Sequence, residues 1–140
     1  MNKSFHHLLM VNQMMLHKQL FARIADTGLS YGQPKVLEYL LEANGCTQRE
    51  IADGCRIEPA SVSSLMTKME ADGLIERRSE DGNRRSLHVY LTDKGRNAAT
   101  CVERTFAVLE AQAFEGIAPE AVGSAKQVLF QVYENLTKGE

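Results

Sequence analysis

The stretch that decides the fold is residues 47–96, which read TQREIADGCRIEPASVSSLMTKMEADGLIERRSEDGNRRSLHVYLTDKGR. It opens with Thr47 and Glu50 at the spacing of a capping box, in which each side chain accepts from the backbone N–H of the other residue. After a tight turn, Pro59 suits the first position of a second helix, and Gly73 ends that helix. Two short helices joined in this way predict a helix-turn-helix unit.

Two segments of strand character follow the second helix, at residues 74–78 and 87–91, and turn-forming residues join them. Within the second segment, apolar residues alternate with His88 and Tyr90, which predicts a half-buried strand with one face in solvent. A hairpin directly behind a helix-turn-helix is a wing. We therefore expect residues 29–96 to form a winged helix-turn-helix module.

Helices are expected on both sides of this module, because apolar residues recur at helical spacing in residues 4–26, 31–43, 94–115 and 119–136. A single small module could not cover the apolar stripes of the terminal helices, and exposed patches of that size mark an interface. We predict a mainly α, α+β winged-helix fold in the order α-α-α-α-β-β-α-α. Residues 1–28 would form an N-terminal dimerisation helix and residues 97–140 the C-terminal dimerisation helices of a homodimer.

The composition favours a cytoplasmic protein. Hydrophobic residues make up 44% of the chain, yet none of its apolar runs approaches the about 18 residues that a membrane span needs. The first residues lack the features of a signal peptide. Three cysteines, Cys46, Cys55 and Cys101, make an odd number without paired spacing, which argues against a disulfide framework and for a reducing compartment.

The charge balance restricts how the module could bind nucleic acid. The chain has a net charge of −2, and residues 47–96 hold nine basic and nine acidic residues. Affinity for phosphates must then come from where the charges lie rather than from their sum. Four arginines fall within nine positions: Arg77, Arg78, Arg84 and Arg85.

The second helix of the unit is the expected reader of base edges in the major groove. Its exposed positions would be Ala60, Ser61, Ser63, Ser64, Thr67 and Lys68. Small hydroxyls allow a close approach to DNA, and Lys68 is placed to reach a phosphate. A serine-rich helix start also arises from capping preference alone, so this signal by itself leaves both explanations open. The hairpin tip could insert Arg84 or Arg85 into a narrow minor groove.

Four motifs within residues 47–96, TQxxIA, VS, MExDGLIER and RRS…LTxKGR, stand in the order and spacing of one family. The chain resembles the MarR family of bacterial transcriptional regulators, and the flanking helices match its layout. The resemblance implies a repressor that binds a palindromic double-stranded operator as a homodimer and is released by a small ligand or by cysteine oxidation. It carries DNA contact over to Ser61, Ser63, Ser64, Thr67 and Lys68 and to the wing arginines Arg84 and Arg85.

This sequence departs from the family pattern at several positions. Asn83 replaces the aspartate that orients the wing arginine, Ser64 and Thr67 replace residues that are often Arg and Asp, and Arg56 stands where the turn often has glycine. An operator sequence therefore cannot be transferred from a relative. Family ligands lie between the dimerisation helices and the reader, where Met14, His17, Phe21 and Tyr31 are candidates here. Core or dimer packing explains a group of methionines equally well.

Other functions have weaker support. A redox-responsive regulator would use Cys46 or Cys55; peroxide-sensing relatives use a cysteine in the first helix, which is absent here. Cys46 precedes a helix start, where a thiol pKa can be lowered, whereas a free cysteine also packs as a small hydrophobe. The histidines lack metal-ligand spacing, and no catalytic motif is present, so we expect no metal, no cofactor and no enzyme. A winged helix that binds only protein partners remains an alternative.

Overall fold

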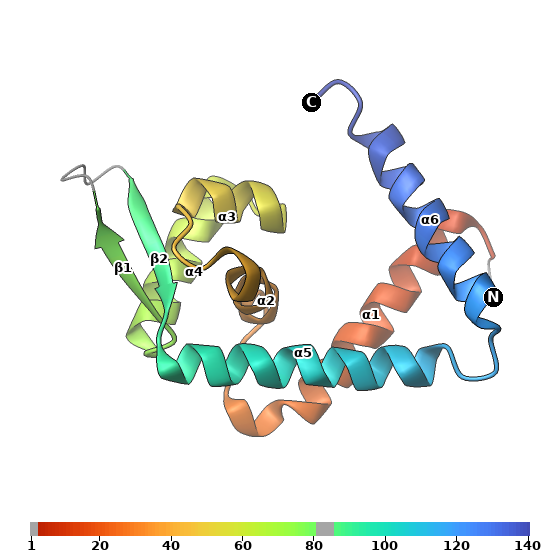
Figure 1. The fold of residues 1–140 in the computed structure, drawn as a ribbon, viewed down its shortest axis with the longest axis horizontal. Helices are drawn as coiled ribbons and strands as arrows, with labels where there is room; N and C mark the ends of the chain where they lie inside the picture. The colour runs from red at the N-terminus through yellow and green to blue at the C-terminus, as the bar shows by residue number, and fades with distance from the viewer. Residues whose placement is uncertain (1–2, 81–85) are drawn as a thin grey trace. The chain divides into compact units, whose positions relative to one another are not determined.

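The computed structural model describes residues 3–80 and 86–140 (Figure 1). The described elements, in chain order, are α1 (Phe5–Arg23), the 3-10 turn η1 (Ala25–Thr27), α2 (Gln33–Ala43), α3 (Gln48–Cys55), α4 (Pro59–Ala71), β1 (Ile75–Ser79), β2 (Leu87–Leu91), α5 (Asp93–Ala113) and α6 (Pro119–Leu136). This order confirms the predicted winged-helix fold class. The chain divides into two compact units, residues 1–107 and 108–140, and each is described by itself.

The core of the first unit lies between α2, α3, α4, the hairpin and the first turns of α5 (Figure 1). Its fully buried members are aliphatic or methionine side chains: Val36, Leu37, Leu40, Ile51, Val62, Met66, Met69, Ile75, Val89 and Ala99. Methionines fill irregular gaps well, which suits a chain without tryptophan. Burial of this cluster fixes α4 against α2 and α3, so the opposite side of α4 faces outward.

The start of α3 confirms the predicted capping box. The backbone N–H of Glu50 donates to Thr47 Oγ1 at 3.2 Å, and the backbone N–H of Thr47 donates to Glu50 Oε2 at 2.8 Å. At its other end, Arg56 takes a left-handed conformation with φ of 52°, and the N–H of Ile57 donates to the carbonyl of Ala52 at 2.9 Å. A side chain is strained in this region of φ. The tight turn between α3 and α4 is therefore made at some conformational cost.

The end of α4 has the two hydrogen bonds of a Schellman motif. The N–H of Gly73 donates to the carbonyl of Glu70 at 3.0 Å, and the N–H of Leu74 donates to that of Met69 at 2.9 Å. Gly73 has a φ of 75°, which glycine adopts without strain. The chain thus turns sharply from α4 into β1, and the motif confirms the predicted helix end.

The wing is an antiparallel hairpin in which Ile75 pairs with Leu91 and Ser79 with Leu87. The segment before α3 lies along the other edge of β2, where the N–H of Val89 donates to the carbonyl of Cys46 at 2.8 Å and the N–H of Gly45 donates to the carbonyl of Val89 at 2.8 Å. The hairpin is therefore anchored to the start of the helix-turn-helix.

The prediction of one solvent face on β2 is wrong. Nδ1 of His88 lies 2.8 Å from the carbonyl oxygen of Gly45, and the guanidinium of Arg78 lies 4.4 Å from the centre of the Tyr90 ring. Both side chains are half-buried. The segment that precedes α3 covers this face, and alternation within β2 gives no sign of that neighbour.

The helix α5 begins against the wing. The hydroxyl of Thr92 accepts from the N–H of Gly95 at 3.0 Å and donates to the carbonyl of Gly73 at 2.6 Å. A Cβ at position 95 would lie 1.9 Å from the carbonyl oxygen of Leu74. Only glycine allows the helix backbone to approach the strand this closely, which gives a physical reason for glycine in the LTxKGR motif.

The terminal helices expose large apolar side chains. On α1 these are Phe5, Leu9, Met10, Met14 and Met15, and on α6 they are Val128, Leu129, Phe130, Tyr133 and Leu136. The exposed residues of α1 lie on several sides of the helix, since each residue turns it by about 100°, so the predicted single stripe is wrong there. In the described parts of the chain, no helix combines the length and apolar character that a membrane span requires.

Candidate nucleic-acid interface

The outward side of α4 carries the five helix residues predicted to contact DNA. Ser61, Ser63, Ser64, Thr67 and Lys68 are all exposed, whereas Val62, Met66 and Met69 of the same helix are buried. Since α4 is the second helix of the helix-turn-helix unit, the exposed side chains of its first two turns lie at the surface of the module. The arrangement presents hydroxyl groups near the helix start and an ammonium group near its end.

Two of these side chains have partners in α4 or at its C-cap. The hydroxyl of Thr67 donates to the carbonyl of Ser63 at 3.0 Å, which leaves its oxygen able to accept a further hydrogen bond. Nζ of Lys68 donates to Oδ2 of Asp72 at 3.0 Å. Exposed ion pairs of this kind contribute about 1 kcal/mol or less, so a DNA phosphate can compete with Asp72 for the ammonium group.

Of the four arginines that lie close together in the sequence, the structure describes Arg77 and Arg78. Arg77 is largely buried, with 18% of its side chain exposed, and it donates to Oε1 of Glu70 at 3.1 Å and to Oε1 of Gln48 at 3.2 Å. This hydrogen bond and the charge of Arg77 hold the pKa of the Glu70 carboxyl below its usual range. The expectation that Arg77 adds to a phosphate-binding cluster is wrong. Its hydrogen bonds instead connect β1 to Gln48 of α3 and Glu70 of α4.

Arg78 is exposed and pairs with Glu76 at 3.0 Å besides lying over Tyr90. The predicted wing contacts Arg84 and Arg85, together with Asn83, lie outside the described residues. Near the base of the wing, Nδ1 of His88 lies 3.7 Å from Oε2 of Glu80. The described part of the hairpin thus holds most of its own charges in local pairs.

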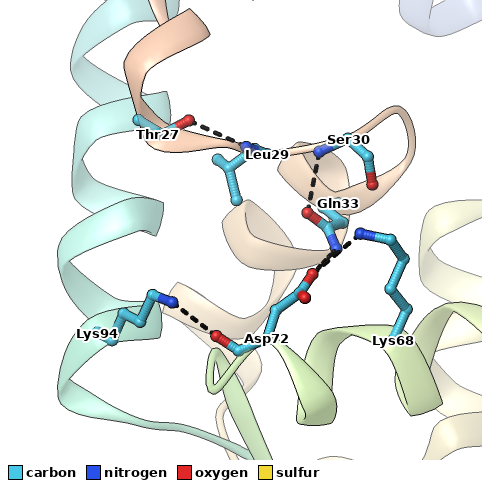
Figure 2. A network of polar contacts seen from close by, with 7 residues as sticks. All are labelled: Thr27, Leu29, Ser30, Gln33, Lys68, Asp72 and Lys94. Carbon is cyan, nitrogen blue, oxygen red and sulfur yellow. Dashed lines mark hydrogen bonds and ion pairs between the residues drawn. The ribbon is translucent and has the colours of Figure 1, made fainter.

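One polar contact at the end of α4 was not expected from the sequence (Figure 2). Within residues 3–80 and 86–140, Gln33 is the one polar side chain that is fully buried, and its Nε2 donates to Oδ2 of Asp72 at 3.1 Å. Hydrogen bonds from Lys68 and Gln33 lower the pKa of the Asp72 carboxyl. A glutamine at a helix start is ordinarily solvated, so only the three-dimensional arrangement identifies this residue.

Three of the four candidate ligand residues form one aromatic cluster. The Tyr31 ring lies 5.6 Å from that of His17 in an edge-on arrangement and 6.2 Å from that of Phe21 in a stacked arrangement, centre to centre. Met14 is exposed one turn earlier on α1. Tyr31 is exposed as well, at 72%, so the cluster has an open side onto which a flat apolar group could pack.

The thiols differ from the expectation for a redox centre. Burial and the nearby charge of Glu50 raise the pKa of Cys46 to about 11, which outweighs any effect of the helix start. Burial also raises the pKa of Cys55, whose Sγ donates to the carbonyl of Lys35 at 3.7 Å. Cys101 is exposed on α5. Among the described residues, no three His, Cys, Asp or Glu side chains gather as metal ligands would.

Comparison with known proteins identifies the module. Residues 27–86 match the model of the MarR family. The HTH-type transcriptional regulator TtmR of Methylorubrum extorquens is 32% identical over 73 residues, which cover 52% of this chain and 37% of that protein. The chain thus spans well under half the length of this curated relative.

The fold is shared with solved structures. A MarR-family regulator from Listeria monocytogenes, crystallised with a 26mer DNA, has a TM-score of 0.88 at 21% identity, covering 96% of this chain and 90% of that one. CouR from Rhodococcus jostii, bound to p-coumaroyl-CoA, has a TM-score of 0.79 at 23% identity and covers 93% of this chain and 91% of its own. At these identities the likeness shows the winged-helix fold.

Proposed function

We propose that the protein is a DNA-binding transcriptional regulator of the MarR family, whose model matches the winged module in residues 27–86. The observation that carries the proposal is the outward side of α4, where Ser61, Ser64 and Lys68 stand exposed behind a capped α3. Short hydroxyl side chains let the helix backbone come close to base edges, and the lysine meets a phosphate. The proposed activity is binding rather than catalysis.

We propose further that the protein acts as a homodimer on a palindromic operator. The support is the row of exposed apolar residues on α6, where Leu129, Tyr133 and Leu136 follow helical spacing. A two-fold dimer would place its two α4 helices about 34 Å apart, one turn of duplex DNA. The twofold symmetry of the protein then matches the symmetry of the operator.

Release by a small molecule is the proposed control, and repression in the cytoplasm the proposed outcome. The support is the open cluster of His17, Phe21 and Tyr31, with Met14 nearby on the same helix. The related structure of CouR holds p-coumaroyl-CoA, a ligand with an aromatic acyl group. For this chain, we propose a flat effector that stacks on the Tyr31 side of the cluster.

The decisive experiment selects genomic fragments with the purified protein and measures their affinity at several salt concentrations. We expect specific fragments with inverted repeats and a linear fall of log affinity with log salt concentration. Lys68→Ala should weaken binding of every fragment and reduce the salt slope by about one, while Lys126→Ala on α6 leaves both unchanged. Enrichment of no fragment, together with capture of a protein partner by the wild type, would favour the protein-interaction module instead.

The wing contribution needs its own arm of this experiment, because Arg84 and Arg85 lie outside the described residues. We propose that Arg85 enters the minor groove, as in the relatives that this wing resembles. Arg85→Ala should then weaken binding most strongly where the groove is narrow, at A·T tracts. Equal loss on every fragment would assign Arg85 to phosphate contact alone.

A further inference from the structure

Asp72 joins the end of α4 to two other elements, one through its carboxylate and one through its backbone carbonyl. Its Oδ2 accepts from Lys68 Nζ at 3.0 Å and from Gln33 Nε2 at 3.1 Å, and its backbone carbonyl accepts from Lys94 Nζ at 2.7 Å (Figure 2). Lys68 belongs to the outward side of α4, Gln33 opens α2 and Lys94 lies in the first turn of α5. One residue thus fixes the helix that faces DNA to both neighbouring helices.

Gln33 is also the residue that closes the turn before α2. Its backbone N–H donates to the carbonyl of Ser30 at 3.1 Å, and its Oε1 accepts from the N–H of Ser30 at 3.0 Å. Both ends of the buried amide are therefore occupied, one by the turn and one by Asp72. Breaking either bond would leave a buried polar group without its partner, which is strongly unfavourable. The turn and the end of α4 must then move together.

The same turn carries Tyr31 into the aromatic cluster. Tyr31 lies between Ser30 and Gly32, whose φ of 89° fixes the chain reversal, and its ring packs on His17 and Phe21 of α1. Displacement of this ring therefore shifts the backbone at Ser30. Because two hydrogen bonds close the turn between Ser30 and Gln33, the Gln33 amide shifts with it. A continuous series of contacts leads from α1 to the Lys68–Asp72 pair.

We propose that Gln33 is the positioning residue that couples the Tyr31 turn to the DNA-facing helix, through its hydrogen bond to Asp72. This inference rests on the proposed function, since it explains how an event at Tyr31 reaches operator binding. Lys68 and Gln33 donate to the same oxygen, so a phosphate that takes Lys68 away leaves Oδ2 to Gln33 alone. Binding of DNA and the position of the turn are then linked in both directions.

The bond itself can be tested by exchanging its donor and acceptor. Gln33→Glu sets a second carboxylate against Asp72, and we expect faster amide hydrogen exchange in residues 66–72 of the DNA-free protein. Adding Asp72→Asn supplies an amide that donates to the new glutamate, and exchange should return to the wild-type rate. If the double variant stays as fast as Gln33→Glu, the two side chains do not pair in solution and the proposal fails.

The coupling is tested by a double-mutant cycle with Tyr31→Ala. In the wild-type background we expect this substitution to change exchange in residues 66–72 by about fivefold or more. In the Gln33→Met background it should have no effect on amide exchange in those residues. Asp72→Ala, which leaves the turn intact, serves as a second uncoupled background should Gln33→Met fold poorly. An equal effect of Tyr31→Ala in all backgrounds, or none in the wild type, would overturn the coupling.

The exchange measurements need no DNA, so their outcome is independent of the proposed function. Where a selected operator fragment binds, its affinity gives the second readout. Tyr31→Ala should alter the dissociation constant about fivefold or more when it is made in the wild type. The same substitution made in the Gln33→Met variant should leave that constant unchanged. A purely structural role for Gln33 would lower stability in each variant while leaving the effect of Tyr31→Ala unchanged.

Discussion

Arg77 binds both oxygens of the Glu70 carboxylate: its guanidinium donates to Oε1 at 3.1 Å and its backbone N–H donates to Oε2 at 3.1 Å. The contact joins the first residues of the wing to α4. Two hydrogen bonds to one carboxylate stabilise the charged form, which lowers the pKa of Glu70 in the folded state.

This contact predicts a loss of stability in acid. Since the pKa of Glu70 is lower in the folded than in the unfolded chain, its contribution is fully present above the unfolded value of about 4.3 and disappears as pH falls through the folded-state value. Urea unfolding between pH 7 and pH 3 should show a smaller decline for Glu70→Gln than for the wild type. With 43% of the Glu70 side chain exposed, we expect a difference of at most about 1 kcal/mol. Parallel curves for the two proteins would contradict the assignment.

The close contact between α5 and the wing predicts a severe effect of a single methyl group. Gly95→Ala places Cβ against the carbonyl of Leu74, where only backbone movement can relieve the overlap, and we expect a loss of about 2 to 3 kcal/mol in the free energy of unfolding. Gly123→Ala on α6 is the matched control, because its new Cβ meets nothing within 4 Å apart from the adjacent residues and backbone of its own helix. That variant should gain up to about 1 kcal/mol from helix propensity.

The left-handed residue after α3 predicts a stabilising substitution. Arg56→Gly removes the contact between Cβ and the following carbonyl at a φ of 52°, and we expect the protein to gain about 1 kcal/mol. Arg56→Ala is the control, since it removes the same charged side chain but keeps Cβ. If urea unfolding finds alanine as stable as glycine, backbone strain is not the cause.

Local signals predicted most of this fold, because each depends on residues near one another in the chain. Thr47 with Glu50, and Pro59 before Ser61, specify helix starts through their own backbone geometry. By contrast, Gln33 and Asp72 stand 39 residues apart, and neither residue type requires the other. Arg77 has the same sequence character as a DNA-contacting arginine, and only its packing against Glu70 distinguishes the two roles. His88 and Tyr90 likewise alternate with apolar residues, as on a solvent-facing strand, whereas the segment around Gly45 covers them in the structure.

The thiols predict a fixed order of labelling. Burial keeps Cys46, with its pKa of about 11, protonated near neutral pH, and a protonated thiol is a poor nucleophile. Native protein treated with iodoacetamide at pH 7.5 should therefore be alkylated first at exposed Cys101, then slowly at Cys55 and Cys46, as read by peptide mass spectrometry. Rapid labelling of Cys46 would support the redox alternative instead. In that case peroxide should weaken DNA binding by the wild type but not by Cys46→Ser.

The apolar side of α6 predicts the oligomeric state. Leu129→Glu introduces a charge between exposed Tyr133 and Val128, and burial of an unpaired carboxylate in an interface is strongly unfavourable. We expect this variant to run as a monomer on a sizing column with light scattering, where the wild type runs as a dimer. Gln127→Glu adds the same charge two residues away, about 200° around the helix, and should remain dimeric. Circular dichroism of each variant separates dissociation from unfolding, because a dissociated but folded chain keeps its helical signal. A wild type that is already monomeric at micromolar concentration, or a Leu129→Glu variant that stays dimeric, would exclude this side of α6 as the interface.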